Sequence, residues 1–315
     1  MTSFMRMRER IRTIFRTHEV GFVRVGHGLA MLAGLLAVMQ AFPFATGVDR
    51  LWIVLALSIL GVFMPLSAEA LVLLAFLLLN LFALSSQIAG VTAGLLVVSY
   101  LFCGVYQAKK LHYITAFIVA RQWSVPGLVP MQAALLGTPN EVVTVICGAI
   151  LSFFLQEVHA NAGVLMDGEE QMPVVDFVRE RIVSNQMFYV YLLAMIAMFL
   201  VVMVLRTRNM DHAWMMAVAG GVSAEFLILL SGYLLVGSQH NIPTLIVANI
   251  VTFLVGAATN YLYRDLDYSR IEKVQFEDDE YYYYVTAVPK IRIAEEKKEV
   301  KTINRVSRSR RERRR

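Results

Sequence analysis

A single glutamate in the middle of a long apolar run is the residue of this chain with the clearest capacity for chemistry. Glu225 lies in GGVSAEFLILLSGYLL, residues 220–235. A charged side chain at the centre of a membrane-spanning helix costs about 2.5–3.5 kcal/mol on insertion scales, so such groups face the protein interior or a water-filled cavity. One interpretation, which we test against the structure, is that Glu225 belongs to a proton- or cation-coupled site or contacts a polar substrate. The alternative is a neutral glutamate that clamps two helices through a buried hydrogen bond.

Other polar side chains in apolar runs are candidate partners of Glu225. Ser223 lies two residues away, and Asn80 lies in an earlier run. Asn249 and Asn260 are eleven positions, or about three helical turns, apart, which places them on one face of the following helix. These groups either line a polar seam with Glu225 or serve only as hydrogen-bonding contacts between helices. The sequence leaves both interpretations open.

A second feature with chemical potential is an interrupted apolar segment at residues 111–139. Its helix-breaking residues are Pro126, Gly127, Pro130, Gly137 and Pro139. Proline removes a backbone donor and clashes with the preceding turn, so the segment cannot form one regular spanning helix. Broken backbone at membrane depth needs protein or a water-filled cavity beside it, and transporters commonly place their sites there. We predict an interfacial helix at 111–123 and a short re-entrant or amphipathic segment at 127–137.

Signatures of other chemistries are absent from the sequence. The histidines and the two cysteines, Cys103 and Cys147, lack the spacing of metal ligands, and both cysteines lie in apolar runs. No nucleophile motif of a hydrolase and no phosphate-binding loop is found. We therefore expect no metal, no cofactor and no enzymatic activity. An intramembrane enzyme ranks below a transporter and below a membrane scaffold.

The amino-acid composition indicates that most of the candidate residues named above lie in a membrane. Of the 315 residues, 57% are hydrophobic and 17% charged, whereas soluble chains are about 45–50% apolar and about 25% charged. A single water-soluble globule is therefore excluded. The apolar runs near spanning length are 25–45, 51–66, 71–86, 91–106, 141–156, 187–205, 213–236 and 243–263. The expected fold is an all-α polytopic membrane protein with about eight transmembrane helices, and the first run is a spanning helix rather than a cleaved leader.

The distribution of charge predicts the topology of the bundle. Lys and Arg near spans remain on the cytoplasmic side. The basic stretches are residues 6–24, Lys109 and Lys110 with Arg121, residues 206–208, and the chain after Arg264. Eight spans with both termini inside place all of them in the cytoplasm and put the acidic loop 157–186 outside. We therefore predict a multi-pass protein of the cell membrane with cytoplasmic N- and C-termini.

The two ends of the chain carry most of its basic charge. We expect residues 1–24 to form an amphipathic helix that contacts anionic lipid headgroups, a commoner use of such a cluster than nucleic-acid binding. Its headgroup contacts would be Arg6, Arg8, Arg10, Arg12 and Arg16. Residues 264–293 have β-branched and aromatic residues on both sides of an acidic pair, which predicts a cytoplasmic β-hairpin. Residues 294–315 should form a basic, disordered tail.

The tyrosines of the expected β-hairpin are candidates for docking a partner protein or a second copy of the chain. They are Tyr281, Tyr282, Tyr283 and Tyr284. A two-stranded ribbon is marginally stable alone in water, which favours docking on another surface.

The pairing of VPGLVPMQAALLGTPNEVVTVICGAILSFF (125–154) with VQFEDDEYYYYVTAVPK (274–290) resembles a group of uncharacterised polytopic membrane proteins of Gram-positive bacteria that are loosely labelled permeases. This resemblance implies a single-membrane envelope and brings no catalytic motif, substrate or cofactor. We expect a transport-related or envelope-assembly component whose broken element moves or lines a pore. The alternative is a scaffold whose bundle only anchors the cytoplasmic tail.

Overall fold

The computed structural model describes most of the apolar part of the chain and two strands that follow it. The described residues are 7, 10–11, 13–15, 17–45, 51–106, 112–166, 173–208, 210, 212–236, 242–263, 272–277 and 282–287. Backbone contacts divide the chain into two units. The first is Met7–Arg264, and the second contains Asp265–Arg315 together with Met1–Arg6.

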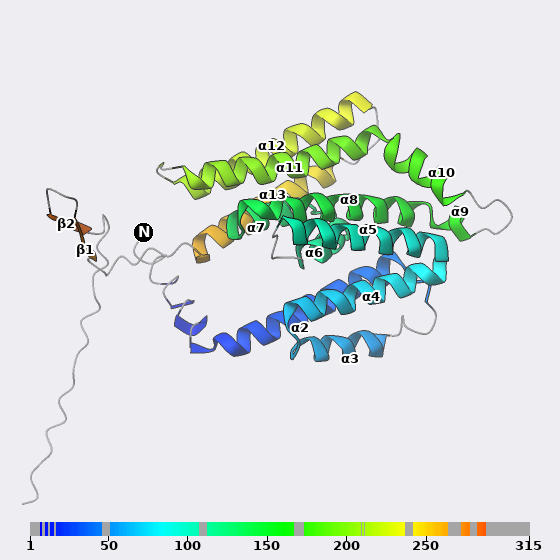
Figure 1. Ribbon diagram of the computed structural model, residues 1–315, viewed down its shortest axis with the longest axis horizontal. Coiled ribbons are helices and arrows are strands. Elements are labelled where there is room, and N and C mark those ends of the chain that lie inside the picture. The colour runs from blue at the N-terminus through cyan, green and yellow to red at the C-terminus, as the bar shows by residue number, and fades with distance from the viewer. Residues whose placement is uncertain are drawn as a thin grey trace, which may run out of the picture. The chain divides into compact units, whose positions relative to one another are not determined.

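The first unit is a bundle of helices (Figure 1). Its long helices are α2 (Glu19–Ala41), α4 (Leu66–Leu84), α5 (Ser86–Val105), α8 (Val142–Ala160), α11 (Gln186–Thr207), α12 (Ala213–Val236) and α13 (Ile242–Tyr263). With the short 3-10 turn η1 (Pro139–Glu141) joined to α8, these seven are long and apolar enough to cross a membrane within the described residues. The chain is therefore a helical, multi-pass membrane protein.

The remaining apolar run, expected to span at 51–66, is shorter than predicted. Helix α3 (Leu51–Gly61) has 11 residues, which is about 16 Å of helix against the roughly 30 Å of a hydrocarbon core. It ends in a turn before Pro65, whose ring disfavours helical conformation in the residue before it. Helix α3 runs back along α2, so α4 has the same direction as α2 (Figure 1).

The alternation of helix directions places the start of α2 and the end of α13 at the same end of the bundle. Helix α2 begins and α13 ends at the left end in Figure 1, where α11 also ends. Helices α8 and α12 end at the right end, where α11 and α13 begin. Arg206 and Arg208 close α11 at the left end, whereas the segment around Glu157 and Asp176 lies at the right end.

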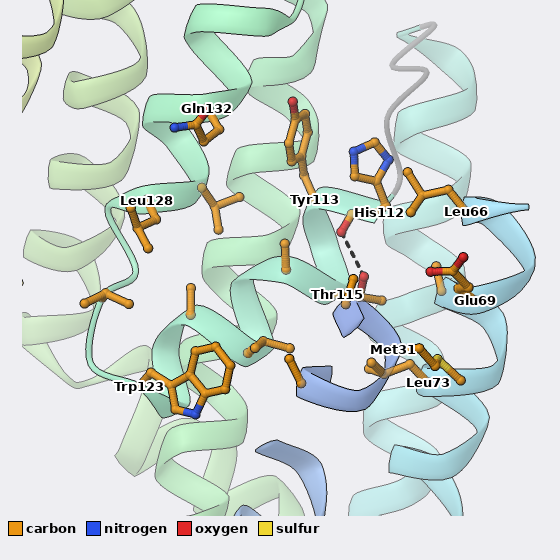
Figure 2. Close-up of a pocket in the computed structure, with 18 residues that line it drawn as sticks. Met31, Leu66, Glu69, Leu73, His112, Tyr113, Thr115, Trp123, Leu128 and Gln132 are labelled. Atoms are coloured by element: carbon orange, nitrogen blue, oxygen red, sulfur yellow. Dashed lines mark hydrogen bonds between the residues drawn. The ribbon is translucent and has the colours of Figure 1, made fainter. Parts of the chain in front are cut away.

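The interrupted segment forms a helical hairpin inside the bundle. Helix α6 (His112–Gln122) is followed by a turn and by α7 (Leu128–Leu136), which runs back beside it (Figure 2). Six of the eleven residues of α6 are buried, against α2, α4 and α8, and α7 packs against α8, α11 and α13. Helix α6 is therefore buried among other helices, which differs from the interfacial helix expected at 111–123, and the helical conformation is interrupted between α6 and α7, around Pro126 and Gly127.

The turn of the helical hairpin is a Schellman motif. Ser124 takes a left-handed backbone conformation with φ of 59°. The Val125 N–H donates to the Ala120 carbonyl at 2.8 Å, and the Ser124 N–H donates to the Arg121 carbonyl at 3.0 Å. This pair of bonds satisfies carbonyls that a helix end leaves unpaired. Pro126 and Gly127 then begin the return helix, so the chain reverses within a few residues.

Small residues bring the last three long helices close together. A Cβ built on Gly220 would lie 2.7 Å from Leu205 Cδ1 of α11, and one on Gly232 would lie 3.1 Å from Val190 Cγ2 of α11. A Cβ on Gly256 of α13 would lie 2.9 Å from Val218 Cγ1 of α12. Without these glycines the backbones could not approach as they do.

The outer segment between α8 and α11 consists of short helical pieces. Helix α9 (Ala162–Met166) precedes residues 167–172, which lie outside the described residues. Helix α10 (Val174–Val178) continues into a π-helical turn, η2 (Arg179–Val183). The inner face buries Phe177 and Ile182, as helical spacing predicts.

In the second unit, strand β1 (Glu272–Glu277) pairs antiparallel with β2 (Tyr282–Ala287). Glu272 is opposite Ala287, and Glu277 is opposite Tyr282. Tyr282, Tyr283 and Tyr284 belong to β2, while Tyr281 lies outside the described residues. Of the five arginines assigned to headgroups, Arg10 is exposed and the other four lie outside the described residues.

Candidate functional site

A cavity of about 560 Å³ extends from the right end of the bundle to the tip of the helical hairpin. Its outer part is lined by residues where α8 and α12 end and where α11 and α13 begin, and its inner part by Glu225 and the hairpin turn. The residues that line it include Arg121, Ser124, Pro126, Phe153, Glu157, Tyr191, Glu225, Leu229, Val236 and Thr244. The volume falls within the range of about 300–1,000 Å³ that is usual for ligand sites.

Glu225 lies at the inner limit of this cavity. It is eleven residues before Val236, the end of α12, or about 16 Å at the rise of an α-helix, which is near the middle of a roughly 30 Å hydrocarbon layer. The side chain is only 3% exposed. Its Oε2 atom has no hydrogen-bond partner among the described residues. A buried carboxyl oxygen without a hydrogen-bond partner costs free energy. We therefore expect Glu225 to bind a ligand or a proton.

The tip of the helical hairpin touches this carboxyl group. A Cβ built on Gly127 would lie 2.5 Å from Oε1 and 2.6 Å from Cδ of Glu225. Gly127 has ordinary helical φ and ψ angles of −61° and −19°, so the glycine is needed for close approach rather than for an unusual backbone. It also precedes the first residue of α7, and the N-terminus of a helix favours negative charge. The break in the sequence therefore positions the hairpin against Glu225.

Arg121 is a functional candidate that the sequence reasoning missed. It was assigned to a cytoplasmic basic stretch, but the structure places it in the last turn of α6, lining the same cavity as Glu225. Its guanidinium carbon lies 4.5 Å from the ring centroid of Tyr191 and 5.9 Å from that of Phe153. No carboxylate of the described residues forms an ion pair with it. The useful signal was a lone arginine three residues before the Ser124-Val125-Pro126-Gly127 break.

The aromatic wall behind Arg121 is itself fixed by packing. Tyr191 is buried, and its hydroxyl lies 3.2 Å from Ser152 Oγ. The rings of Phe153 and Tyr191 are 5.7 Å apart. An arginine stacked on aromatic rings keeps its N–H edge available for a carboxylate or phosphate.

A second cavity, of about 370 Å³, lies on the other side of the helical hairpin. Residues of α2 and α4, such as Met31 and Leu73, form one wall, and hairpin residues, such as Trp123 and Leu128, form the other (Figure 2). Its lining is almost entirely apolar. The helical hairpin therefore separates a polar cavity from an apolar one, and both cavities include residues of its turn.

Charged and polar groups beside the second cavity hold helices together. Glu69 of α4 forms an ion pair with His27 of α2, whose Nδ1 also lies 3.2 Å from the Met64 carbonyl oxygen. Thr259 of α13 donates to Gln132 of α7 at 3.1 Å, which ties the helical hairpin to the bundle. Neither contact was expected from the sequence.

The other predicted polar residues do not gather around Glu225. Ser223 is exposed while Glu225 is buried, because a separation of two residues turns their side chains to different faces of α12. Asn249 donates to the Leu245 carbonyl of its own helix, and its Oδ1 has no partner among the described residues. Asn260 lies near Met215, with Nδ2 4.0 Å from the sulfur.

Asn80 has a structural role instead. The side chain is 0% exposed, donates to the Phe76 carbonyl at 3.0 Å and accepts from the Ala45 N–H at 3.2 Å. It thereby fixes the segment that leaves α2 onto α4. None of these atoms lines the polar cavity.

The remaining helix-breaking residues shape the other end of the helical hairpin. Pro130 is buried within α7, and Gly137 ends that helix before Pro139 begins η1. Arg206 of α11 donates to the carbonyls of Leu135 and Gly137, the latter at 3.2 Å. These bonds satisfy carbonyls at the end of α7. They also fix the open end of the helical hairpin at the left end of the bundle, so the hairpin enters and leaves there.

Comparison of the chain with protein-family models, with curated proteins and with solved structures finds no match. The assignment of function therefore depends on geometry. Within the described residues no group of three or more His, Cys, Asp or Glu side chains is arranged to hold a metal ion. In the part of the chain that the structure describes, the charged groups that line the polar cavity are Arg121, Glu157 and Glu225. This arrangement suits reversible binding of a polar solute or of a proton.

Proposed function

We propose that this multi-pass membrane protein transports a small polar solute and that the α6–α7 helical hairpin is its moving part. The supporting observation is the polar cavity that reaches Glu225 at the depth of the bilayer centre. A scaffold needs only a dry bundle, whereas a cavity with a buried, unpaired carboxyl group at its base suits binding and release. Re-entrant or broken helices at a central site are a common design of transporters.

The position of the helical hairpin supplies the second argument. One side of its turn lines the polar cavity, through Ser124 and Pro126, and the other side lines the apolar cavity, through Val125 and Leu128. A small tilt of the hairpin would close one cavity and enlarge the other, which is the movement that alternating access requires. Glu225, in contact with the tip, would bind a proton or cation whose presence sets the hairpin position. The expected topology, with both termini in the cytoplasm of a single-membrane cell, directs the polar cavity outward.

Cysteine accessibility tests this proposal without knowledge of the solute. In a Cys103→Ala, Cys147→Ala background, Leu229→Cys places one thiol deep in the polar cavity and Thr244→Cys places one at its mouth. A membrane-impermeant methanethiosulfonate reagent is added to right-side-out and to inside-out vesicles. We expect Leu229→Cys to react from both faces and Thr244→Cys from one face only. Reaction of Leu229→Cys from one face alone, or from neither, would refute alternating access.

The role of Glu225 is tested in the same vesicles. Glu225→Gln keeps the size of the side chain and removes its ability to ionise. Because the reagent attacks the thiolate, the rate of Leu229→Cys labelling from the far face is divided by the rate of Thr244→Cys labelling at the same pH. We expect this ratio to lose its dependence on pH between pH 5 and 9. Unchanged pH dependence together with unchanged thermal stability would remove Glu225 from the mechanism.

A further inference from the structure

We infer that the solute bound in the polar cavity is a small zwitterion carrying both an ammonium and a carboxylate group, of the size of an amino acid or a short peptide. This inference rests on the proposed transport function and specifies the chemical class of its substrate. The carboxylate would bind Arg121 and the ammonium would bind Glu225. Each of the two residues supports one half of the assignment.

Arg121 has the geometry of a carboxylate receptor. Its planar guanidinium lies against the ring of Tyr191, with Phe153 beside it, so its orientation is set by packing. It forms no ion pair with a carboxylate of the described residues. A guanidinium held in this way offers parallel N–H donors that match the two oxygens of a carboxylate.

Glu225 has the complementary properties. It is nine-tenths or more buried, lines the cavity, and has an Oε2 atom without a hydrogen-bond partner among the described residues. No arginine or lysine of the described residues forms an ion pair with it. An ammonium group donates three hydrogen bonds and carries the opposite charge, so it would satisfy this oxygen.

The balance of charge separates a zwitterion from other solutes. Among the described residues, the lining contains one cationic side chain, Arg121, and two acidic ones, Glu157 and Glu225. A solute with several negative charges, such as an organic phosphate, would face more acidic than basic groups. A purely cationic solute would meet the like charge of Arg121 in a partly desolvated site, which is unfavourable. A solute with one charge of each sign satisfies both.

The rest of the lining fits the apolar part of such a molecule. Phe153, Leu229 and Val236 provide aromatic and aliphatic surface between the charged groups and the mouth. The cavity volume of about 560 Å³ leaves room for a side chain or a second residue. In ligand sites the polar groups usually fix the orientation of the ligand, while the apolar walls tolerate variation in its apolar part.

A ligand-blocking series tests the inference on the purified full-length chain in detergent. The probes are the twenty common L-amino acids and L-alanyl-L-alanine, each at 10 mM, with the thermal unfolding temperature as readout. The tightest probe is then titrated beside its N-acetyl form, which lacks the ammonium, and its amide form, which lacks the carboxylate. We expect at least one zwitterion to raise the unfolding temperature and both blocked forms to bind at least tenfold more weakly. Failure of every zwitterion to stabilise the protein, or equal binding of a blocked form, would overturn the inference.

Variants assign each charged group of the ligand to a residue. Arg121→Gln should weaken the zwitterion at least tenfold while leaving the amide form within threefold, and Glu225→Gln should do the same for the N-acetyl form. Glu157→Gln removes another cavity carboxylate and should change zwitterion affinity less than threefold. If Arg121→Gln does not fold, Arg121→Lys keeps the charge and should retain weaker binding. An effect of Glu157→Gln as large as that of Glu225→Gln would overturn the placement of the ammonium.

The two experiments fail in different ways. Accessibility of Leu229→Cys from both faces needs no ligand, so two-sided labelling without zwitterion binding would refute only the substrate class. Zwitterion binding with one-sided labelling would refute transport and leave the ligand site intact.

Discussion

Substitution of Gly127 by alanine is expected to force the tip of the helical hairpin away from Glu225. The added Cβ would lie 2.5 Å from Oε1 and 2.6 Å from Cδ of the glutamate, well inside the normal contact distance of about 3.5–4.0 Å between carbon atoms. The obstacle is the carboxyl end of a side chain that is only 3% exposed, so either Glu225 must change its conformation within a packed site or the tip of the hairpin must shift. Such overpacking typically costs about 1–3 kcal/mol.

Taking about 2 kcal/mol as the central value, Gly127→Ala should raise the unfolding equilibrium constant roughly 30-fold. The free energy of unfolding is measured by titration with sodium dodecyl sulfate in mixed micelles. Gly94→Ala is the matched control, because a Cβ at Gly94 of α5 meets nothing within 4 Å. In the interior of a helix, glycine to alanine gains about 0.5–1 kcal/mol, so the control should be neutral or stabilising.

The cause of the loss is isolated by a double-mutant cycle with Glu225→Ala. This second substitution removes the atoms that the new methyl group would meet. The cost of Gly127→Ala should therefore fall below about 0.5 kcal/mol in the Glu225→Ala background, which corresponds to a coupling energy of at least 1 kcal/mol. An equal cost in both backgrounds would refute the contact between the hairpin tip and Glu225.

Three further predictions concern how the helical hairpin and the bundle are held. Ser124→Gly should raise the free energy of unfolding by about 1 kcal/mol, because glycine adopts a positive φ without the penalty that serine pays, and Ser124→Val should lower it. Arg206→Met should lower the free energy of unfolding by about 1.5–3 kcal/mol, because it removes charged hydrogen bonds to two carbonyls at the end of α7. The control, Arg208→Met, changes an exposed arginine and should alter this free energy by less than about 0.5 kcal/mol. Equal effects of the two substitutions would show that the hydrogen bonds of Arg206 do not stabilise the protein. Asn80→Ala should cost about 1–3 kcal/mol in the same titration but leave the labelling of Leu229→Cys unchanged, and altered labelling would show that Asn80 is more than structural.

The main features of the site could be predicted from local sequence, but their contact could not. Glu225 stood out because no other acidic residue lies in its apolar run, and Pro126 with Gly127 marked a break. Gly127 and Glu225 are 98 positions apart, and nothing in the composition or periodicity of either segment indicates that they meet. That contact is a property of how α7 packs between α8, α11 and α13.

The wrong assignments have identifiable physical causes. The rule that places arginines on the cytoplasmic side assumes that a charge outside a span is in water, and Arg121 instead lies in a hairpin that folds into the bundle. Ser223 was paired with Glu225 by proximity in sequence, although two residues correspond to about 200° around a helix. Pro65 indicates in the sequence that α3 must end before it, but hydrophobicity alone, which defined the run 51–66, does not take account of a proline.

The shortness of α3 has a consequence for the lipids around the protein. Trp52, Leu55 and Ile59 are exposed on its outer side, where lipid acyl chains would contact them. The helix is about 16 Å long, whereas the hydrocarbon core of a bilayer is roughly 30 Å thick. Hydrophobic mismatch of this size is relieved by thinning of the bilayer beside the helix. This flank should therefore recruit short-chain lipids, and vesicles made with progressively longer acyl chains should distort the packing of α3 on α2 before they disturb the rest of the protein.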